Sequence, residues 1–307
     1  MTDFAIETLN LTKSFGHTHA VNGLNLSINL GSIFGLIGEN GAGKSTTFGM
    51  FGGWLKPSSG KAKILGTPLQ NLHKLRGKIG FLPQDSFLPP QERVENIALY
   101  FCHLAGVPKN QAKKERNRIL QLVNLQDAAR NQVKELSHGM YKRLCLAQAI
   151  AGKPQLIFLD EPTAGLDPTQ TLRVKAIIQE HLQGATVVIS SHQLEQLEKL
   201  CTHGAIIHEG KIVASGSMDE LTGKNQQLKI ELAPQTSIAL EKLASHLPQY
   251  SFSLNDRFLE CLVPHGLSVE DAIHATVSHI FADGGRILGI ERGGSLESFY
   301  LATTQKS

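Results

Sequence analysis

Short apolar runs rich in β-branched residues alternate with helix-forming stretches along the first 215 or so residues. The runs that predict strands lie at 4–11, 24–30, 32–38, 61–66, 78–83, 156–160, 186–191 and 205–216. Candidate helices lie between several of them, at 44–54, 91–105, 111–123, 140–151, 169–182 and 193–200. Strands interleaved with helices predict an α/β fold with a mostly parallel sheet.

Two parts of the chain depart from this alternation. Residues 91–135 read as helical throughout, so we expect a helical subdomain, at about 85–150, inserted into the α/β core. Later in the chain, strand-like runs at 228–233, 250–255, 257–264 and 286–291 mix with helix-like runs at 237–247, 268–281 and 295–304. The pattern therefore predicts two domains, an α/β domain over 1–225 and a small α+β domain over 226–307.

Composition narrows the class of protein. The length of 307 residues agrees with two domains, and 41% hydrophobic with 19% charged residues is ordinary for a soluble globular chain. A net charge of +3 without a long basic stripe argues against nucleic acid as a partner. Four cysteines without paired spacing favour a reducing cytosol over a disulfide framework or a zinc site. No apolar run reaches the ~18–20 residues of a membrane span, so at a membrane another chain is expected to supply the spans.

The stretch "GENGAGKST" at residues 38–46 has the spacing of a phosphate-binding loop, and it follows an apolar strand and opens a helical stretch, as that motif requires. Glycines let successive backbone N–H groups curl around phosphate oxygens, and the helix adds its N-terminal dipole. We expect Lys44 to bridge the β- and γ-phosphates of ATP and Ser45 to give its hydroxyl to Mg²⁺. The candidate ATP-binding residues of this loop are Gly38, Asn40, Gly41, Gly43, Lys44, Ser45 and Thr46.

The apolar run 156–159 ends at two adjacent carboxylates, Asp160 and Glu161. Burying unpaired carboxylates is costly, so the pair calls for a cation or a reaction. In phosphate-loop enzymes an acid at the end of an apolar strand holds magnesium, and Asp160 fits that role. Glu161 is then expected to orient or deprotonate the attacking water. The alternative is a salt-bridged strand end facing solvent, which the phosphate loop makes the weaker interpretation.

Further motifs occur in a fixed order. "FLPQD" spans 81–85, "ELSHGMYKRLCLAQAI" begins at 135, "LIFLDEPTAGLD" follows, and "VVISSHQLEQLEKLC" begins at 187. Together with the phosphate loop, this set resembles the nucleotide-binding subunit of an ABC transporter over roughly residues 4–220. The resemblance implies an ABC ATPase with a phosphate-loop NTPase core, which hydrolyses ATP with the help of Mg²⁺.

The resemblance also implies roles for single residues. Phe15 is expected to stack on adenine, although a core aromatic is the alternative. Gln84 is expected to reach the metal and to sense the transmembrane partner, Asp167 to lie in the loop that crosses the dimer interface, and His192 to contact the γ-phosphate. The implied metal set is Ser45, Gln84 and Asp160, and the implied catalytic set is Glu161, His192 and Gln84.

The segment "LSHGM" resembles the family signature and is expected to form one half of a binding site that a second subunit completes. Ser137 and the Gly139 amide are expected at a helix N-terminus, which favours negative charge but lies far from its own phosphate loop. They would serve the γ-phosphate of a second, facing subunit, so that two chains close around two ATP molecules and hydrolysis reopens them. His138 stands where the common L-S-G-G-Q form has glycine, and Met140 where it has glutamine. Because His138 has a Cβ, it needs a negative φ or some strain.

The ending "RGGSLESFYLATT" partly resembles that of the ABC-2-type exporter branch, from which Ser298 and Phe299 depart. This resemblance implies an exporter with a separate transmembrane permease, a second nucleotide-binding subunit (an identical or a related chain), and a peripheral place on the cytoplasmic face of the cell membrane. The alternative is a soluble ABC ATPase acting on ribosomes or DNA, which the single phosphate loop and the lack of heptads disfavour. A GTP switch would need an N-K-x-D element, which we do not find.

Overall fold

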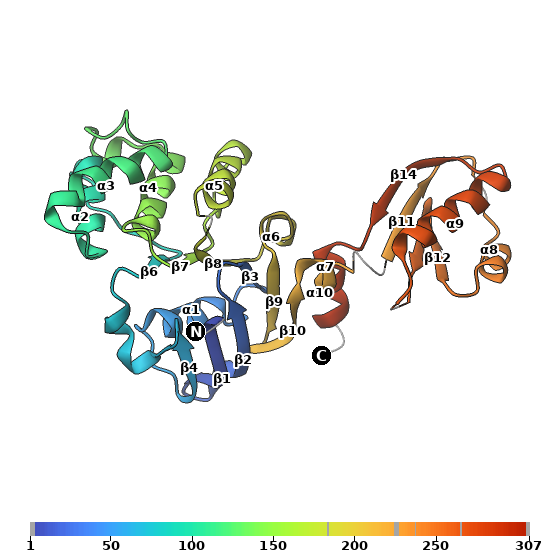
Figure 1. Cartoon of the computed structure of the whole chain (residues 1–307), viewed down its shortest axis with the longest axis horizontal. Coiled ribbons are helices and arrows are strands. Elements are labelled where there is room, and N and C mark those ends of the chain that lie inside the picture. The colour runs from blue at the N-terminus through green and yellow to red at the C-terminus, as the bar shows by residue number, and fades with distance from the viewer. Residues whose placement is uncertain (1–3, 183, 224–226, 237, 265, 305–307) are drawn as a thin grey trace. The chain divides into compact units, whose positions relative to one another are not determined.

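A computed structural model describes the chain except for residues 1–3, 183, 224–226, 237, 265 and 305–307 (Figure 1). The chain divides into two compact units, Met1–Ser215 and Gly216–Ser307. This division falls ten residues before the predicted boundary after residue 225. The difference arises because helix α7 (Met218–Leu221) is tied to the C-terminal unit, where the Gly294 amide donates to the Thr222 carbonyl at 2.8 Å.

The central sheet of the first unit has the strand order β10-β9-β3-β8-β7-β6. Its strands are β3 (Ile33–Ile37), β6 (Ile79–Leu82), β7 (Leu156–Asp160), β8 (Thr186–Ser191), β9 (His203–His208) and β10 (Lys211–Ser217). The pairs β3/β8, β3/β9, β6/β7 and β7/β8 are all parallel. Strands β7 and β8 are buried at every position, as expected for parallel strands covered on both faces. The predicted α/β fold with a mostly parallel sheet is confirmed.

A second sheet of the first unit is antiparallel, with the order β2-β1-β4-β5. It consists of β1 (Phe4–Phe15), β2 (Thr18–Asn29), β4 (Ser59–Ile64) and β5 (Thr67–Pro68). The hydrophobic pattern of the sequence does not distinguish the strands of this sheet from those of the parallel one. The tight turn between β1 and β2, where Gly16 has a φ of 58°, forces antiparallel pairing. Helix α1 (Lys44–Gly52) packs against both β2 and β7 and joins the two sheets into one core.

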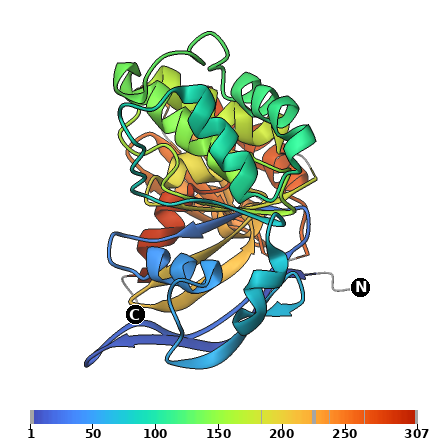
Figure 2. The same cartoon turned by 90° about the vertical axis from the view of Figure 1, so that its left-hand side faces the viewer.

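Helices α2 (Val94–Leu104), α3 (Lys109–Leu122) and α4 (His138–Ile150) lie between β6 and β7 in the sequence and pack on one another as a group (Figures 1 and 2). A 3₁₀ turn, η1 (Leu69–Leu75), precedes β6, and a second, η2 (Val133–Glu135), lies between α3 and α4. Helix α5 (Pro168–His181) precedes β8, and α6 (Leu194–Leu200) follows it. Helix α4 also packs on β6 and β7, so it connects the helical group to the parallel sheet.

The C-terminal unit contains β11 (Gln227–Leu232), α8 (Leu240–His246), β12 (Ser251–Asn255), β13 (Phe258–Leu262), α9 (Val269–Ala282), β14 (Ile287–Arg292) and α10 (Leu296–Thr304). The strand order is β12-β13-β11-β14 with antiparallel neighbours throughout, which is the split βαβ arrangement of ferredoxin-like domains. One set of alternating strand residues, including Leu228 and Ile230, forms the core of this unit. On the opposite face of this sheet, Lys229 lies between Glu260 and Glu291 on the two neighbouring strands, so opposite charges stand beside each other.

Candidate functional site

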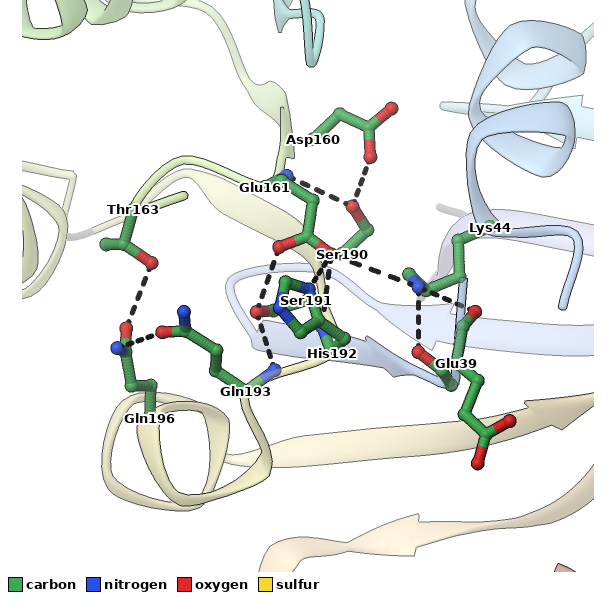
Figure 3. A network of polar contacts seen from close by, with 11 residues as sticks. Glu39, Lys44, Asp160, Glu161, Thr163, Ser190, Ser191, His192, Gln193 and Gln196 are labelled. Atoms are coloured by element: carbon green, nitrogen blue, oxygen red, sulfur yellow. Dashed lines mark hydrogen bonds and ion pairs between the residues drawn. The ribbon is translucent and has the colours of Figure 1, made fainter. Parts of the chain in front are cut away.

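The candidate site lies where four parallel strands end. Carboxyl ends of parallel strands meet at one edge of a sheet, so the segments that follow β3, β6, β7 and β8 come together. The register pairs Ile37 with Ser191, Asp160 with Ser190, and Leu82 with Leu159. The phosphate loop, the carboxylate pair and His192 therefore emerge side by side, as Figure 3 shows.

The phosphate loop connects β3 to α1, and two of its glycines are required by packing within the protein. A Cβ on Gly38 would lie 2.4 Å from the Ile207 carbonyl oxygen, and one on Gly43 would lie 2.4 Å from the Ala20 carbonyl oxygen. Gly43 and Gly41 also have φ values of 108° and 87°, which disfavour other residues. The glycines are thus needed for two reasons. Strands β9 and β2 approach the loop too closely for a Cβ, and phosphate binding needs the backbone freedom of glycine.

Helix α1 begins at Lys44, so the loop leads into a helix N-terminus, the kind of helix end that favours anions. Asn40 and Ser45 are exposed and Thr46 is half-buried, which leaves all three accessible to a ligand. Thr47 is buried instead, and its hydroxyl donates to the Gly43 carbonyl at 2.9 Å. The loop residues predicted to bind ATP therefore lie around one helix N-terminus.

The buried Lys44 ammonium is surrounded by oxygens. Its Nζ donates to the carbonyls of Gly38 at 2.7 Å and Glu39 at 3.0 Å, and lies 3.9 Å from Glu161 Oε1 (Figure 3). Burial lowers the pKa of Lys44, while the carboxylates of Glu161 and Asp160 act in the opposite direction. The loop thus already places this cation among oxygen acceptors.

Asp160 is the last residue of β7 and is buried. The Ser190 hydroxyl, from the neighbouring strand β8, donates to its Oδ1. Burial raises the pKa of Asp160, whereas hydrogen bonds from the Ser190 and Ser45 hydroxyls lower it. The Ser45 hydroxyl is therefore within reach of the Asp160 carboxylate, as a shared metal site requires.

Glu161 follows in a left-handed backbone conformation, with a φ of 48°. Such a φ costs a non-glycine residue about 1 kcal/mol or more, and it turns the Glu161 side chain away from Asp160 (Figure 3). Its backbone N–H donates to the Ser190 carbonyl at 3.1 Å, which holds the turn. Its Oε2 accepts from the Ser191 hydroxyl at 3.2 Å. Two adjacent carboxylates thus have separate surroundings.

His192 follows β8 and contacts the same carboxylate. Its backbone N–H donates to Glu161 Oε1 at 3.1 Å, and its ring Nδ1 lies 2.9 Å from that oxygen. The side chain is 43% exposed, whereas the Glu161 side chain is buried. The imidazole therefore links the buried carboxylate to solvent at the mouth of the site.

Gln84 follows β6 on the other side of the carboxylates. It is exposed, and it lines a cavity of about 80 Å³ together with Asp160, Glu161 and residues of α4. Among the described residues, no group of three or more His, Cys, Asp or Glu side chains is arranged to hold a metal alone. A metal here would need oxygens from a ligand as well.

Comparison with known proteins agrees with this geometry. A profile of the ABC transporter family matches residues 21–164. Nod factor export ATP-binding protein I of Rhizobium sp. (strain N33) is 37% identical over 223 residues, 71% of this chain and 72% of that protein. The ABC transporter ATP-binding protein all4389 of Nostoc sp. (strain PCC 7120) is 31% identical over 294 residues, 94% of this chain and 84% of that protein. The chain is an ABC transporter ATP-binding protein.

A solved structure extends the similarity to three dimensions. The chain matches cbiO1 of Clostridium perfringens, part of the ABC transporter complex cbiONQ, with a TM-score of 0.66 and 26% identity over 80% of this chain and 97% of that one. The predicted family, fold class and function, an ATPase subunit that energises transport, are confirmed. The ABC domain binds ATP, and the protein belongs to a transporter complex with membrane components. Within the described ranges, no helix has the length and apolar character of a membrane span.

The segment predicted to be the family signature lies at the start of α4, where Ser137 is the N-cap and its hydroxyl accepts from the Met140 amide at 3.3 Å. His138 is the first helical residue and is not among the described residues with a positive φ, so it replaces glycine without backbone strain. A Cβ on Gly139 would lie 2.7 Å from the Gln170 side chain, so packing within the chain also requires glycine at this position.

Asp167, predicted for the loop at the dimer interface, is the N-cap of α5 and accepts from the Gln170 amide at 2.8 Å. The imidazole of His138 lies against Gly165 in the same loop, because a Cβ there would be 3.3 Å from its Nε2. The signature and this loop therefore pack together within one chain.

Phe15 ends β1 and is 52% exposed, so it is not a core aromatic. The Lys13 ammonium lies 5.0 Å from its ring centroid. The exposed ring is available to stack on a planar ligand.

Ser190 and Ser191 were not predicted to belong to the site, although their hydroxyls bind the two carboxylates. A signal was present, because two serines end an otherwise apolar and fully buried strand. Buried hydroxyls require partners, and the nearest acceptors follow only from the pairing of β8 with β7.

Proposed function

We propose that this ABC ATPase powers export, through a permease that is a separate chain carrying the membrane spans. Relatives named for Nod factor export, bacitracin transport and linearmycin resistance support an export role. The observation that carries the proposed chemistry is the meeting of Lys44, Asp160 and Glu161 at one edge of the sheet. The protein would then act at the cytoplasmic face of the membrane, held there by the permease.

The residues present fit Mg²⁺ bound together with ATP. Mg²⁺ prefers oxygen ligands and is usually held by one or two protein groups plus phosphates and water. The Asp160 carboxylate and the Ser45 hydroxyl lie within reach of each other, and Gln84 lines the same cavity as Asp160. When bound, Mg²⁺ neutralises charge on the β- and γ-phosphates.

Lys44 then binds the β- and γ-phosphates by exchanging two loop carbonyls for phosphate oxygens. The first-turn amides of α1 orient the phosphates. Glu161 accepts a proton from the attacking water, and its position is held by Ser191 and by the His192 backbone. The His192 imidazole, being partly exposed and joined to Glu161, contacts the γ-phosphate.

Ser137 and the Gly139 amide complete the site of a second subunit. They lie at the N-terminus of a 13-residue helix, where an anion is stabilised. Two nucleotide-binding subunits, identical or related, thus close on two ATP molecules and open after hydrolysis. Phe87, three residues after Gln84, is 86% exposed, and such an apolar side chain beside the site suits contact with the permease.

The test uses the tagged Glu161→Gln protein, which binds Mg-ATP but is expected to hydrolyse it far more slowly than the parent. Membranes of the host, solubilised in mild detergent with Mg-ATP, should yield a polytopic membrane protein at near one-to-one stoichiometry. Glu180→Gln, an exposed carboxylate on α5, is the matched control and should hydrolyse ATP at the parental rate.

Either of two results would contradict the proposal. Parental turnover in Glu161→Gln would remove Glu161 as the general base. Recovery of the tag only with ribosomal or DNA-repair proteins, in the absence of any polytopic membrane protein, would rule out the export role.

A further inference from the structure

Tyr141 connects two parts of the site that are about fifty residues apart in the sequence. Its hydroxyl donates to the Ser86 carbonyl at 2.7 Å and accepts from the Leu88 amide at 3.0 Å. The neighbouring Lys142 ammonium donates to the Gln84 carbonyl at 3.4 Å. All of these contacts are to main-chain atoms, so they determine the path of residues 84–88.

Tyr141 also belongs to the first turn of α4. Its backbone N–H donates to the Ser137 carbonyl at 2.9 Å, which places the phenol one helical turn after the signature serine. Helices in a packed domain move as rigid elements. A displacement of the signature is therefore passed directly to the phenol and to the segment that it holds.

The Tyr141 residue lies at the candidate ATP site. Tyr141 lines the same cavity as Gln84, Asp160 and Glu161. Burial raises the pKa of Tyr141, so its hydroxyl remains protonated and keeps both its donor and its acceptor function. A neutral group that donates and accepts at once is suited to clamp a chain through one carbonyl and one amide.

We infer that Tyr141 is a positioning residue that locks residues 84–88 to the start of α4, so that Gln84 and the signature move as one body during the ATPase cycle. The inference rests on the proposed function, since it assigns Gln84 and Ser137 to opposite ATP sites of a closing dimer. Without the clamp, the signature could move while Gln84 stays behind, and closure would assemble an incomplete site.

The test is Tyr141→Phe in the full chain, which removes the hydroxyl and leaves the ring. Tyr100→Phe is the control, because Tyr100 lies on α2 and is exposed. Three quantities are measured: hydrogen exchange at residues 84–88, the Kd for a fluorescent ATP analogue, and kcat for ATP hydrolysis. We expect faster exchange at the Leu88 amide, an unchanged Kd and a fall in kcat of about tenfold, the factor that corresponds to about 1.4 kcal/mol.

The expected split between kcat and Kd separates positioning from general destabilisation, which would weaken nucleotide binding as well. Unchanged exchange at residues 84–88 would refute the clamp itself. Faster exchange with parental kcat would refute its function. Absence of ATP hydrolysis in the parent would instead refute the proposed function, and the exchange result would still decide whether the clamp exists.

Discussion

Replacing Arg143 tests how the helical group is held together. Arg143 lies on α4 and is only 4% exposed. Its Nη1 donates to the carbonyl of Val123 at 2.5 Å and to that of Asn124 at 2.9 Å. These carbonyls follow α3, where backbone acceptors lack helical partners and a cation is favourable. The side chain therefore closes the end of α3 from a different helix.

The expected effect of Arg143→Met follows from two opposing contributions. Burial lowers the pKa of Arg143, with a further contribution from Arg173, because removing a charge from water is costly. Removing the charge recovers part of this cost. The Val123 carbonyl, however, is left buried without a donor, at a cost of about 1–3 kcal/mol, and the interaction with the helix end is lost as well. We expect a net loss of about 2 kcal/mol.

The assay is urea unfolding followed by tryptophan fluorescence. Trp54 is the only tryptophan of the chain, and it contacts Phe81 in the first unit with ring centroids 4.4 Å apart. Its signal therefore reports on that unit. With a slope of about 2 kcal/mol per molar, the midpoint should fall by about 1 M.

Arg130→Met is the control for the loss of charge, because Arg130 is exposed and follows α3 in the same helical group. Its effect should stay within about 0.5 kcal/mol, as for most surface substitutions. A midpoint for Arg143→Met equal to the parental one would show that the α3 carbonyls do not depend on Arg143, and the reasoning would be wrong.

Three further predictions concern the site and the thiols. Ser191→Ala removes a donor to Glu161 Oε2, so we expect kcat to fall by about tenfold with an unchanged nucleotide Kd, and equal losses in both would contradict this. Gly38→Ala places a Cβ 2.4 Å from the Ile207 carbonyl oxygen, so we expect the free energy of unfolding to fall by about 1–3 kcal/mol and the urea midpoint to fall with it. An unchanged midpoint would exclude this close approach. Burial raises the pKa of three buried thiols, so a thiolate-specific reagent at pH 8 should label them slowly in the native protein and quickly in urea; rapid native labelling would contradict their burial. These pKa values are about 11 for Cys102, about 12 for Cys201 and about 11 for Cys261.

Local spacing was enough to predict much of this protein. The phosphate loop, the carboxylate pair and the helical N-terminus of the signature were all placed correctly on their elements. Each depends on a stretch of fewer than about 20 residues, in which glycine, a charge and strand or helix periodicity occur together. The α/β class followed from the same local alternation.

Strand order was decided only by the tertiary structure. Strand β8 lies between β3 and β7, which are far apart in the sequence, and this placement brings Ser190 to Asp160. The left-handed φ of Glu161 is likewise held by the Ser190 carbonyl of the adjacent strand. No local pattern encodes these pairings, because they arise from the packing of segments about 30 residues or more apart.

The glycines illustrate the same division. Sequence alone identified Gly38, Gly43 and Gly139 through their motifs and related them to phosphate. The folded chain adds that β9, β2 and the Gln170 side chain approach them too closely for a Cβ. The motifs identify these glycines from local sequence, because the backbone of the loop and its phosphate ligand both favour glycine. Which segments also pack against the glycines is decided only when distant parts of the chain come into contact.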